Sequence, residues 1–258
     1  MLKGWRSLGQ KLHQAVITRR FVSTGPCFTL SEGRPTSIRL VSPKRVSYQE
    51  AASIQENYVR KWLDFKAGKG PKEELEPTIF MFEMPPVYTC GRRERGSLSE
   101  QEIEFLRAGG TADFVEASRG GQTTFHGPGQ LVAYPIIDLR QYGLPVRCYV
   151  SLLETAIINT LARYNLEGTT TKDTGVWMND KEKIAAIGIH VRRNITSHGI
   201  ALNVSTDPWW FNRIVACGLP DKATTTMALQ GVSADLDKVG QIFGEEVSNL
   251  LGSKLIKE

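Results

Sequence analysis

The chain has 258 residues, 41% of them hydrophobic, which is enough to bury one sizeable core or at most two small ones. No apolar run approaches the roughly 20 residues that a membrane-spanning helix needs, so we expect no membrane insertion. The net charge of +5 comes from residues 1–35, where six Lys or Arg residues face Glu32 alone and leave 26 basic and 26 acidic residues elsewhere. Because that remainder is neutral, composition gives no reason to expect nucleic-acid binding.

Residues 1–35 have the composition of a mitochondrial targeting sequence. They contain no acidic residue before Glu32, and apolar residues recur every three or four positions from Trp5 to Val16. Arginine-rich, acid-poor and amphipathic segments are typical of presequences, and TRRFVST (18–24) resembles a cleavage site. An ordinary surface helix or a disordered tail is the alternative. We expect a leader that is cleaved or disordered, and a location in the mitochondrial matrix.

The remaining residues, 36–258, are predicted to form one mixed α/β domain, because no interdomain linker or internal repeat interrupts them. Period-two or continuous apolar patterns predict strands at 36–41, at 78–91 with a break at Pro85-Pro86, at 113–118, at 131–138, and in GVWM, KIAAIGIHV and HGIALNVS. Helical periodicity predicts helices over 47–68, 147–166 and 235–255. The stretch 66–77 is expected to be a charged loop, and a charged stretch follows the 78–91 strand region at 92–102.

Four widely spaced cysteines, Cys27, Cys90, Cys148 and Cys217, form no CxxC pair. This spacing argues against a disulfide framework or a structural zinc site, and it is typical of a reducing compartment. Cys90 and Cys148 fall within a strand-like and a helical run, where a small buried side chain is the simplest interpretation.

The stretch RGGQTTFHGPGQ, from Arg119 to Gln130, is rich in glycine and precedes a predicted strand. It lacks the lysine of a nucleotide phosphate loop, and no helix follows it as a dinucleotide fingerprint requires. A single histidine without a neighbouring acid or thiol is poor metal chemistry. Its glycines allow positive φ and a close approach of backbone to a ligand. A binding loop and a tight hairpin are the two interpretations left.

Cys217 and Lys183 are the candidates for chemistry. Cys217 stands between Ala216 and Gly218, whose small side chains leave room for an acyl group, although a free cysteine is often only a buried apolar residue. Lys183 lies where a polar hairpin meets an apolar strand; it is either solvated or directed into a pocket. A lysine ammonium beside a thiol lowers the pKa of that thiol.

Two clusters of basic residues, RRER (92–95) and RRNIT (192–196), interrupt the otherwise neutral domain. Such clusters are usually solvated faces. Either one is alternatively a docking point for an acidic partner.

Three blocks, in this order and spacing, resemble the octanoyl-[acyl carrier protein]:protein N-octanoyltransferases of lipoate synthesis. They are RGGQTTFHGPGQLVAYPIIDL, TGVWMNDKEKIAAIGIHVRRNITSHGIALNV and RIVACGL, within residues 78–231. The resemblance implies a fold like that of biotin and lipoate protein ligases, with a mixed β-sheet flanked by helices. It implies no metal, no cofactor and no ATP.

The same resemblance implies an acyl transfer between two protein partners. The donor is the octanoyl thioester of acyl carrier protein. The acceptor is a lysine of a lipoyl domain, such as the glycine cleavage H protein or a 2-oxoacid dehydrogenase E2. Neither nucleic acid nor membrane is an expected partner.

Residue by residue, Cys217 matches the acyl-thioester cysteine of the family, and Lys183 matches the lysine that lowers its pKa. The matching substrate-binding positions are Arg119, Gly120, Gly121, Gln122, Thr123, Thr124, Phe125 and His126, then Ala186, Ile187 and Gly188, and finally Gly199, Ile200 and Ala201. One departure is Ala216, where the family commonly has proline; we expect only a small change in loop stiffness.

Four alternatives remain open. A lipoate or biotin protein ligase would activate a free acid with ATP and would need neither Cys217 nor a carrier protein. An octanoyl amidotransferase would use similar cysteine chemistry between lipoyl domains. An inactive docking module would not need the pair Cys217 and Lys183. Nucleic-acid binding is the weakest alternative because the domain is neutral.

Overall fold

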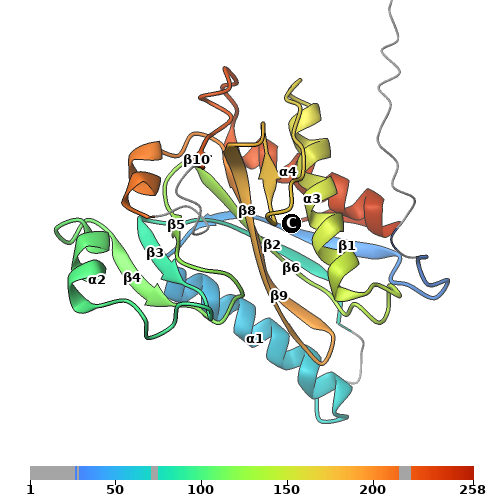
Figure 1. Cartoon of the computed structure of the whole chain (residues 1–258). Helices are drawn as coiled ribbons and strands as arrows, with labels where there is room; N and C mark the ends of the chain where they lie inside the picture. The colour runs from blue at the N-terminus through green and yellow to red at the C-terminus, as the bar shows by residue number, and fades with distance from the viewer. Residues whose placement is uncertain (1–26, 28, 71–74, 215–221) are drawn as a thin grey trace, which may run out of the picture.

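A computed structural model describes residues 27, 29–70, 75–214 and 222–258, and it confirms a mixed α/β architecture (Figure 1). The main sheet has eight strands in the order β10-β8-β9-β6-β2-β1-β11, with β7 also paired to β8. A smaller sheet has the order β4-β3-β5. β1 runs parallel to β2 and β11, whereas β6 runs antiparallel to β2 and β9.

The strands are β1 (Ser37–Arg45), β2 (Thr78–Glu83), β3 (Val87–Cys90), β4 (Asp113–Glu116), β5 (Thr124–His126), β6 (Gln130–Ile136), β7 (Val176–Trp177), β8 (Glu182–Arg192), β9 (Ile195–Asn203), β10 (Ala223–Thr224) and β11 (Lys254–Lys257). The helices are α1 (Tyr48–Lys66), α2 (Glu100–Arg107), α3 (Val146–Ala162), α4 (Leu236–Leu251) and the 3₁₀ helix η1 (Pro208–Arg213). The three predicted helices and the predicted strands are therefore confirmed, with small shifts of their ends.

Helices cover both faces of the main sheet (Figure 1). On one face, α3 and α4 pack over the sheet around a core that includes Leu153, Ile157 and Phe243. On the other face, α1 lays Val59 and Trp62 against β6 and β9. β6 and β9 lie between these two layers, and every residue of both strands is buried.

The ends of the predicted helices follow from local chemistry. Ser47 caps α1 by accepting a hydrogen bond from the backbone N–H of Glu50, at 3.1 Å. Asp235 caps α4 in the same way, through the N–H of Lys238 at 2.9 Å. α4 ends at Gly252 in the left-handed conformation, so the predicted helix to residue 255 is too long.

Five elements were not predicted: α2, β5, β11, and the two short elements η1 and β10. The charged stretch 92–102 runs into α2, whose capping box joins Ser99 and Glu102 reciprocally. β5 lies inside the glycine-rich stretch, because it completes the small sheet beside β3. β11 extends the main sheet beside β1. Short strands such as these depend on partners that are distant in the sequence, which a local pattern does not show.

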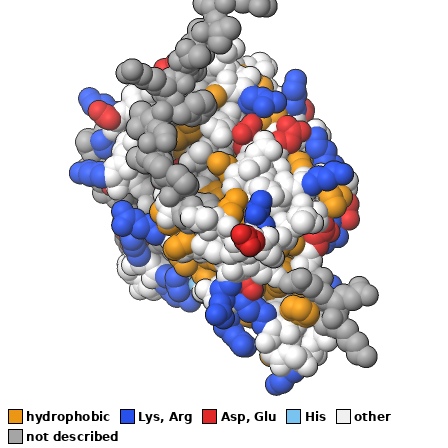
Figure 2. All heavy atoms as spheres, turned by 90° about the vertical axis from the view of Figure 1, so that its right-hand side faces the viewer, with side chains coloured by type: hydrophobic (Ala, Val, Ile, Leu, Met, Phe, Trp, Pro, Cys, Tyr) orange, Lys and Arg blue, Asp and Glu red, His pale blue; other side chains and the backbone are white. Residues whose placement is uncertain are grey.

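The face formed by the right-hand side of Figure 1 carries no large area of a single charge. Figure 2 shows Lys and Arg side chains interspersed there with Asp, Glu and hydrophobic side chains. Within the described residues, no helix is long and apolar enough to cross a membrane, and no cluster of three or more His, Cys, Asp or Glu residues is placed to hold a metal ion.

The described residues just before position 36 contact the domain. The N–H of Ser31 donates to the carbonyl of Tyr142 at 3.2 Å, and Leu30 packs against the main core. The guanidinium of Arg34 donates to the carbonyls of Ser31 and Gly252. The predicted targeting helix, residues 5–16, lies outside the described residues.

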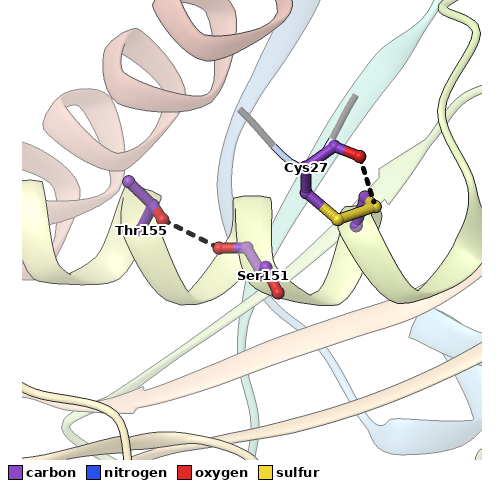
Figure 3. The surroundings of a disulfide bond; sticks show 4 residues. Cys27, Ser151 and Thr155 are labelled. Carbon is purple, nitrogen blue, oxygen red and sulfur yellow. Dashed lines mark hydrogen bonds between the residues drawn. A yellow bond between two sulfur atoms is a disulfide. The ribbon is translucent and has the colours of Figure 1, made fainter. Parts of the chain in front are cut away.

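A disulfide joins Cys27 to Cys148 at the start of α3, with 5.6 Å between the Cα atoms (Figure 3). This corrects the prediction that the cysteines form no disulfide. The two residues are separated by 121 positions, and only the path of the segment before β1 brings them together. Cys90 is buried and free, as predicted.

Candidate functional site

The predicted substrate-binding residues converge on one cavity of about 480 Å³. Every one of them except Phe125 lines this cavity, and Lys183 lines it as well. Phe125 instead points into the small-sheet core, where its ring stacks on Trp210 with 4.9 Å between centroids. The three sequence blocks are therefore brought together in space, although they come from separate parts of the chain.

The edge of β8 forms one wall of the cavity. β7 pairs with β8 only as far as Ala185, and the N–H of Gly120 donates to the carbonyl of Ile189 at 3.1 Å. The residues between these two contacts, Ala186 to Gly188, line the cavity and pair with β9 on their other side. Unpaired strand edge of this kind, in the described part of the chain, offers backbone groups to a ligand.

Small residues bring β8 and β9 close to the rest of the site. Gly188 faces Gly199, and Ala186 faces Ala201, across the β8–β9 pair. A Cβ on Gly199 would lie 2.2 Å from the carbonyl oxygen of Ala133 on β6. No other residue fits there without moving backbone, which explains why a glycine stands in the middle of a buried strand.

Arg119 holds the glycine-rich loop in place. Its guanidinium donates to the carbonyls of Gly120 and Gln122, at 3.0 and 2.9 Å, and to both oxygens of Thr89 on β3. The side chain is only 7% exposed. Only the planar guanidinium group of an arginine can donate in all these directions at once, so Arg119 fixes the shape of the loop.

His126 is a neutral histidine in the cavity wall. Burial lowers its pKa to about 4, and the positive charge of Arg119 acts in the same direction. The amide of Gln130 donates to Asn203 and to the carbonyl of Phe125, so its oxygen must accept the 2.7 Å bond from Nδ1 of His126. This bond places the proton on Nδ1 and leaves Nε2 as an acceptor.

Lys183 lies at the start of β8 and is 6% exposed, which excludes the solvated interpretation. Its Nζ donates to the carbonyl of Thr174 at 2.8 Å and lies 4.7 Å from the centre of the Trp177 ring. Glu154 on α3 accepts a 3.0 Å bond from the N–H of Gly175, the next residue. Lys183 is thus held among a carbonyl, an aromatic face and a nearby carboxylate.

Gly175 is required for this arrangement. Its φ of +126° is rarely adopted by residues with a side chain. A Cβ there would lie 2.6 Å from the carbonyl oxygen of Ala185 and about 3.1 Å from Cε of Lys183. The turn therefore packs backbone directly on the lysine.

Cys217, together with Ala216, lies outside the described residues. The described chain resumes at Lys222, and β10 follows at once. In β10, Ala223 pairs with Glu182 and Thr224 pairs with Lys183. Thr224, a few residues after Cys217 in the sequence, is therefore the strand-pairing partner of Lys183.

The structure adds cavity residues that sequence reasoning did not single out. They are Arg93, Tyr134, Val150, Lys172, Asp173, Thr174, Ile189 and His198. Tyr134, Thr174, Ile189 and His198 stand inside the sequence blocks described above, so their signal was proximity to a motif. Val150 and Tyr134 come from a helix and a strand whose apolar patterns indicate only burial.

Comparison with known proteins finds a matching family model and relatives of similar sequence. A family model described as the lipoyl protein ligase A/B catalytic domain matches residues 47–248. A probable octanoyltransferase of Schizosaccharomyces pombe is 50% identical over 210 residues, which cover 81% of this chain and 93% of that protein. The mitochondrial octanoyl-[acyl-carrier-protein]:protein N-octanoyltransferase LIPT2 of Danio rerio is 42% identical, over 74% of this chain and 82% of its own.

Solved structures share the fold at low sequence identity. A bipartite lipoate protein ligase from Thermoplasma acidophilum superposes with a TM-score of 0.66 at 12% identity, covering 86% of this chain and 87% of its own. A lipoate-protein ligase A bound with ATP gives a TM-score of 0.60 at 13% identity, over 87% and 88% of the two chains. The predicted ligase-like mixed sheet is confirmed.

Proposed function

The chain belongs to the lipoyl protein ligase A/B catalytic domain family and is an octanoyltransferase, and we propose that it carries the octanoyl group as a thioester on Cys217. In this proposal the donor is octanoyl-acyl carrier protein and the acceptor is a lysine of a lipoyl domain. The observation that carries it is the burial of Lys183 in the cavity wall, beside the strand that follows the Cys217 segment.

The first half-reaction exchanges one thioester for another. The thiolate of Cys217 attacks the octanoyl carbonyl, and the bond from that carbonyl to the phosphopantetheine sulfur breaks. The ammonium of Lys183 protonates the departing thiolate. Because the bond formed is equivalent to the bond broken, the step needs no external energy, and a difficult transfer becomes two easier ones.

The second half-reaction forms the amide. The neutral amine of the acceptor lysine attacks the Cys217 thioester, Lys183 as an amine takes the proton, and the cysteine leaves as thiolate. An amide is more stable than a thioester, so this step is downhill. Lys183 thereby alternates between acid and base within one cycle and ends in its starting state.

One wall of the cavity suits an alkyl chain. Its strand wall is built from Ala186, Gly188 and Ala201, with Ile187 and Ile200 beside them. An apolar wall of this kind suits the alkyl part of a ligand, and the polar side chains on the other walls, among them Thr123, Thr124 and Lys183, suit its polar end. Arg119 uses its described hydrogen bonds to hold its own loop. This favours an acyl transferase over an ATP-dependent ligase.

The names of the relatives support a mitochondrial location. Several are named mitochondrial, including those of Danio rerio and Saccharomyces cerevisiae, which supports a mitochondrial protein. We place it in the matrix, with the H protein or an E2 subunit as acceptor. Fusing residues 1–35 to a reporter tests the leader: a reporter that stays in the cytosol would remove the targeting assignment.

The acyl-enzyme is tested by intact-protein mass spectrometry with octanoyl-acyl carrier protein and no ATP. We expect one octanoyl adduct, which maps to Cys217, disappears in Cys217→Ala and is discharged by a lipoyl domain. Cys90→Ala is the matched control, since Cys90 is the described free cysteine, and it should retain the adduct. Transfer that persists in Cys217→Ala, or that requires ATP, would overturn the thioester mechanism.

The role of Lys183 is tested separately. Lys183→Ala is expected to lower kcat/KM by roughly 10²- to 10⁴-fold, as for loss of a general acid–base group. It should also raise the alkylation pKa of the Cys217 thiol. An unchanged thiol pKa would remove Lys183 from this role while leaving the acyl-enzyme itself intact.

A further inference from the structure

We propose that His198 sets the length of acyl chain that the enzyme accepts, because it closes the cavity against a second groove that adjoins it. The inference rests on the proposed function, in which the cavity holds the acyl chain. His198 was not among the predicted site residues.

The second groove has a volume of about 400 Å³ and lies between α1, the end of β4 and the β8–β9 hairpin. Its walls include Gln55 on α1 and His190 and Arg192 on β8. Among the described residues, His198 is the one that lines both the groove and the cavity. A single side chain therefore stands between two spaces of similar size.

His198 is held in this position by an unusual backbone. Its φ is +56° in the middle of β9, a conformation that costs a residue other than glycine of order 1–3 kcal/mol. Its N–H donates to Oε1 of Gln55 at 2.5 Å, which ties it to α1. Its ring forms a T-shaped pair with the ring of Tyr134, with 5.4 Å between centroids. Strain that the surroundings maintain is common where a side chain has a function.

The geometry of β8 places His198 at the end of the cavity away from the chemistry. His198 pairs with Ile189 on β8. The Nζ of Lys183 lies beside Gly175, whose backbone packs on the carbonyl of Ala185, and Ala185 is four residues before Ile189 on the same strand, roughly 13 Å at the usual strand rise. An acyl chain whose carbonyl lies near Lys183 extends past Ala186 and Gly188 towards His198. The terminal methyl group of a long chain would then meet the imidazole.

The chemical state of His198 suits this contact. Burial lowers its pKa to about 3, so the ring is neutral at physiological pH. The nearby positive charges of Arg119 and Arg192 act in the same direction, as do His126 and His190. A neutral aromatic ring can meet a methyl group without the large cost of desolvating a charge.

The test is a chain-length profile with octanoyl, decanoyl, dodecanoyl and palmitoyl carrier-protein donors. His198→Gly removes the side chain at a φ that glycine adopts freely, so the variant should fold. We expect the ratio of kcat/KM for dodecanoyl over octanoyl donors to rise by about tenfold or more, since single methylene groups are discriminated by that factor. His198→Asn, which also tolerates positive φ, should give a smaller rise.

His190→Ala is the matched control, because His190 lines the groove but not the cavity. It should leave the profile unchanged. The proposal is overturned if folded His198→Gly and His198→Asn keep the wild-type profile, or if His190→Ala broadens it equally. Ala186→Leu, which fills the cavity, should abolish octanoyl transfer. Full transfer by Ala186→Leu would instead reject the cavity as the acyl site, and with it the role of His198, whereas the Cys217 acyl-enzyme would fail only in its own adduct test.

Discussion

Glu154 on α3 and Lys183 on β8 hold the two sides of one turn: Glu154 accepts from the N–H of Gly175 at 3.0 Å, and Lys183 donates to the carbonyl of Thr174 at 2.8 Å. Burial raises the pKa of Glu154, while the Gly175 bond and the charge of Lys183 oppose that rise. The Thr174 carbonyl and the Gly175 N–H belong to the same peptide unit, so α3 helps to position Lys183 through that one peptide.

If Glu154 acts by positioning, losing its hydrogen bond should matter more than losing its charge. Glu154→Ala is expected to lower kcat/KM by about tenfold, the equivalent of one hydrogen bond. Glu154→Gln keeps an oxygen acceptor and should lose much less, with an unchanged pH–rate profile. Equal losses in both variants, with a shifted profile, would show instead that the carboxylate charge is what matters.

Arg119→Lys tests whether the loop is shaped by the guanidinium. One ammonium group cannot reach both the loop carbonyls and Thr89, so the loop should become less ordered. We expect KM for the octanoyl donor to rise roughly tenfold with a smaller change in kcat, as for lost positioning. Arg95→Lys, at an exposed ion pair with Glu116, is the control and should stay near wild type. Wild-type KM in Arg119→Lys would contradict the bracing role.

The buried His126 should make stability depend on pH. Its pKa is about 4 in the folded chain and 6.5 ordinarily, so the unfolded chain binds more protons between these values. Its contribution is complete above pH 6.5 and is lost as the pH falls through 4, by an amount on the order of 3 kcal/mol. Urea denaturation from pH 4 to 7 measures it. His126→Asn, which can still donate to Gln130, should make this dependence less steep, and the part that remains comes from His198, whose pKa burial lowers to about 3. An equally steep curve would exclude His126 as a cause.

The Cys27–Cys148 disulfide should stabilise the domain under oxidising conditions. Cross-links of this kind typically contribute about 2–4 kcal/mol, so reductant should lower the urea midpoint of the wild-type protein. Cys148→Ser should show the lower midpoint already, with no further effect of reductant. Non-reducing peptide mapping identifies the bond directly. A wild-type midpoint that ignores reductant would mean that the cross-link does not form or does not stabilise.

The long helices and strands could be predicted from the sequence because their hydrophobic periodicity is strong. α1 and α4 combine an amphipathic pattern with a Ser or Asp cap, and these features were read locally. β5 and β11 were missed because each is short and exists only by pairing with β3 or β1. The disulfide was missed for the same reason, since its two cysteines meet through tertiary structure alone.

The site residues also divide into those that the sequence predicted and those that only the structure shows. Blocks of sequence identified Lys183 and the loop from Arg119, and the structure brings their residues to one cavity. Phe125, inside the same block, turned out to serve the small core, because alternate residues of β5 face opposite sides. His198 and Glu154 carry no signal of their own in the sequence. Their importance comes from a backbone angle and from a neighbouring turn.

The position of β11 has a practical consequence. It closes the main sheet at one edge, whereas β8 and β10 close the opposite edge, where the cavity lies. The last residue, Glu258, is bonded to β1 through Ser42 and Arg39. An enzyme immobilised through a short tether at Glu258 would therefore have the whole width of the sheet between the solid support and the cavity. The cavity would stay accessible to a carrier protein and then to a lipoyl domain.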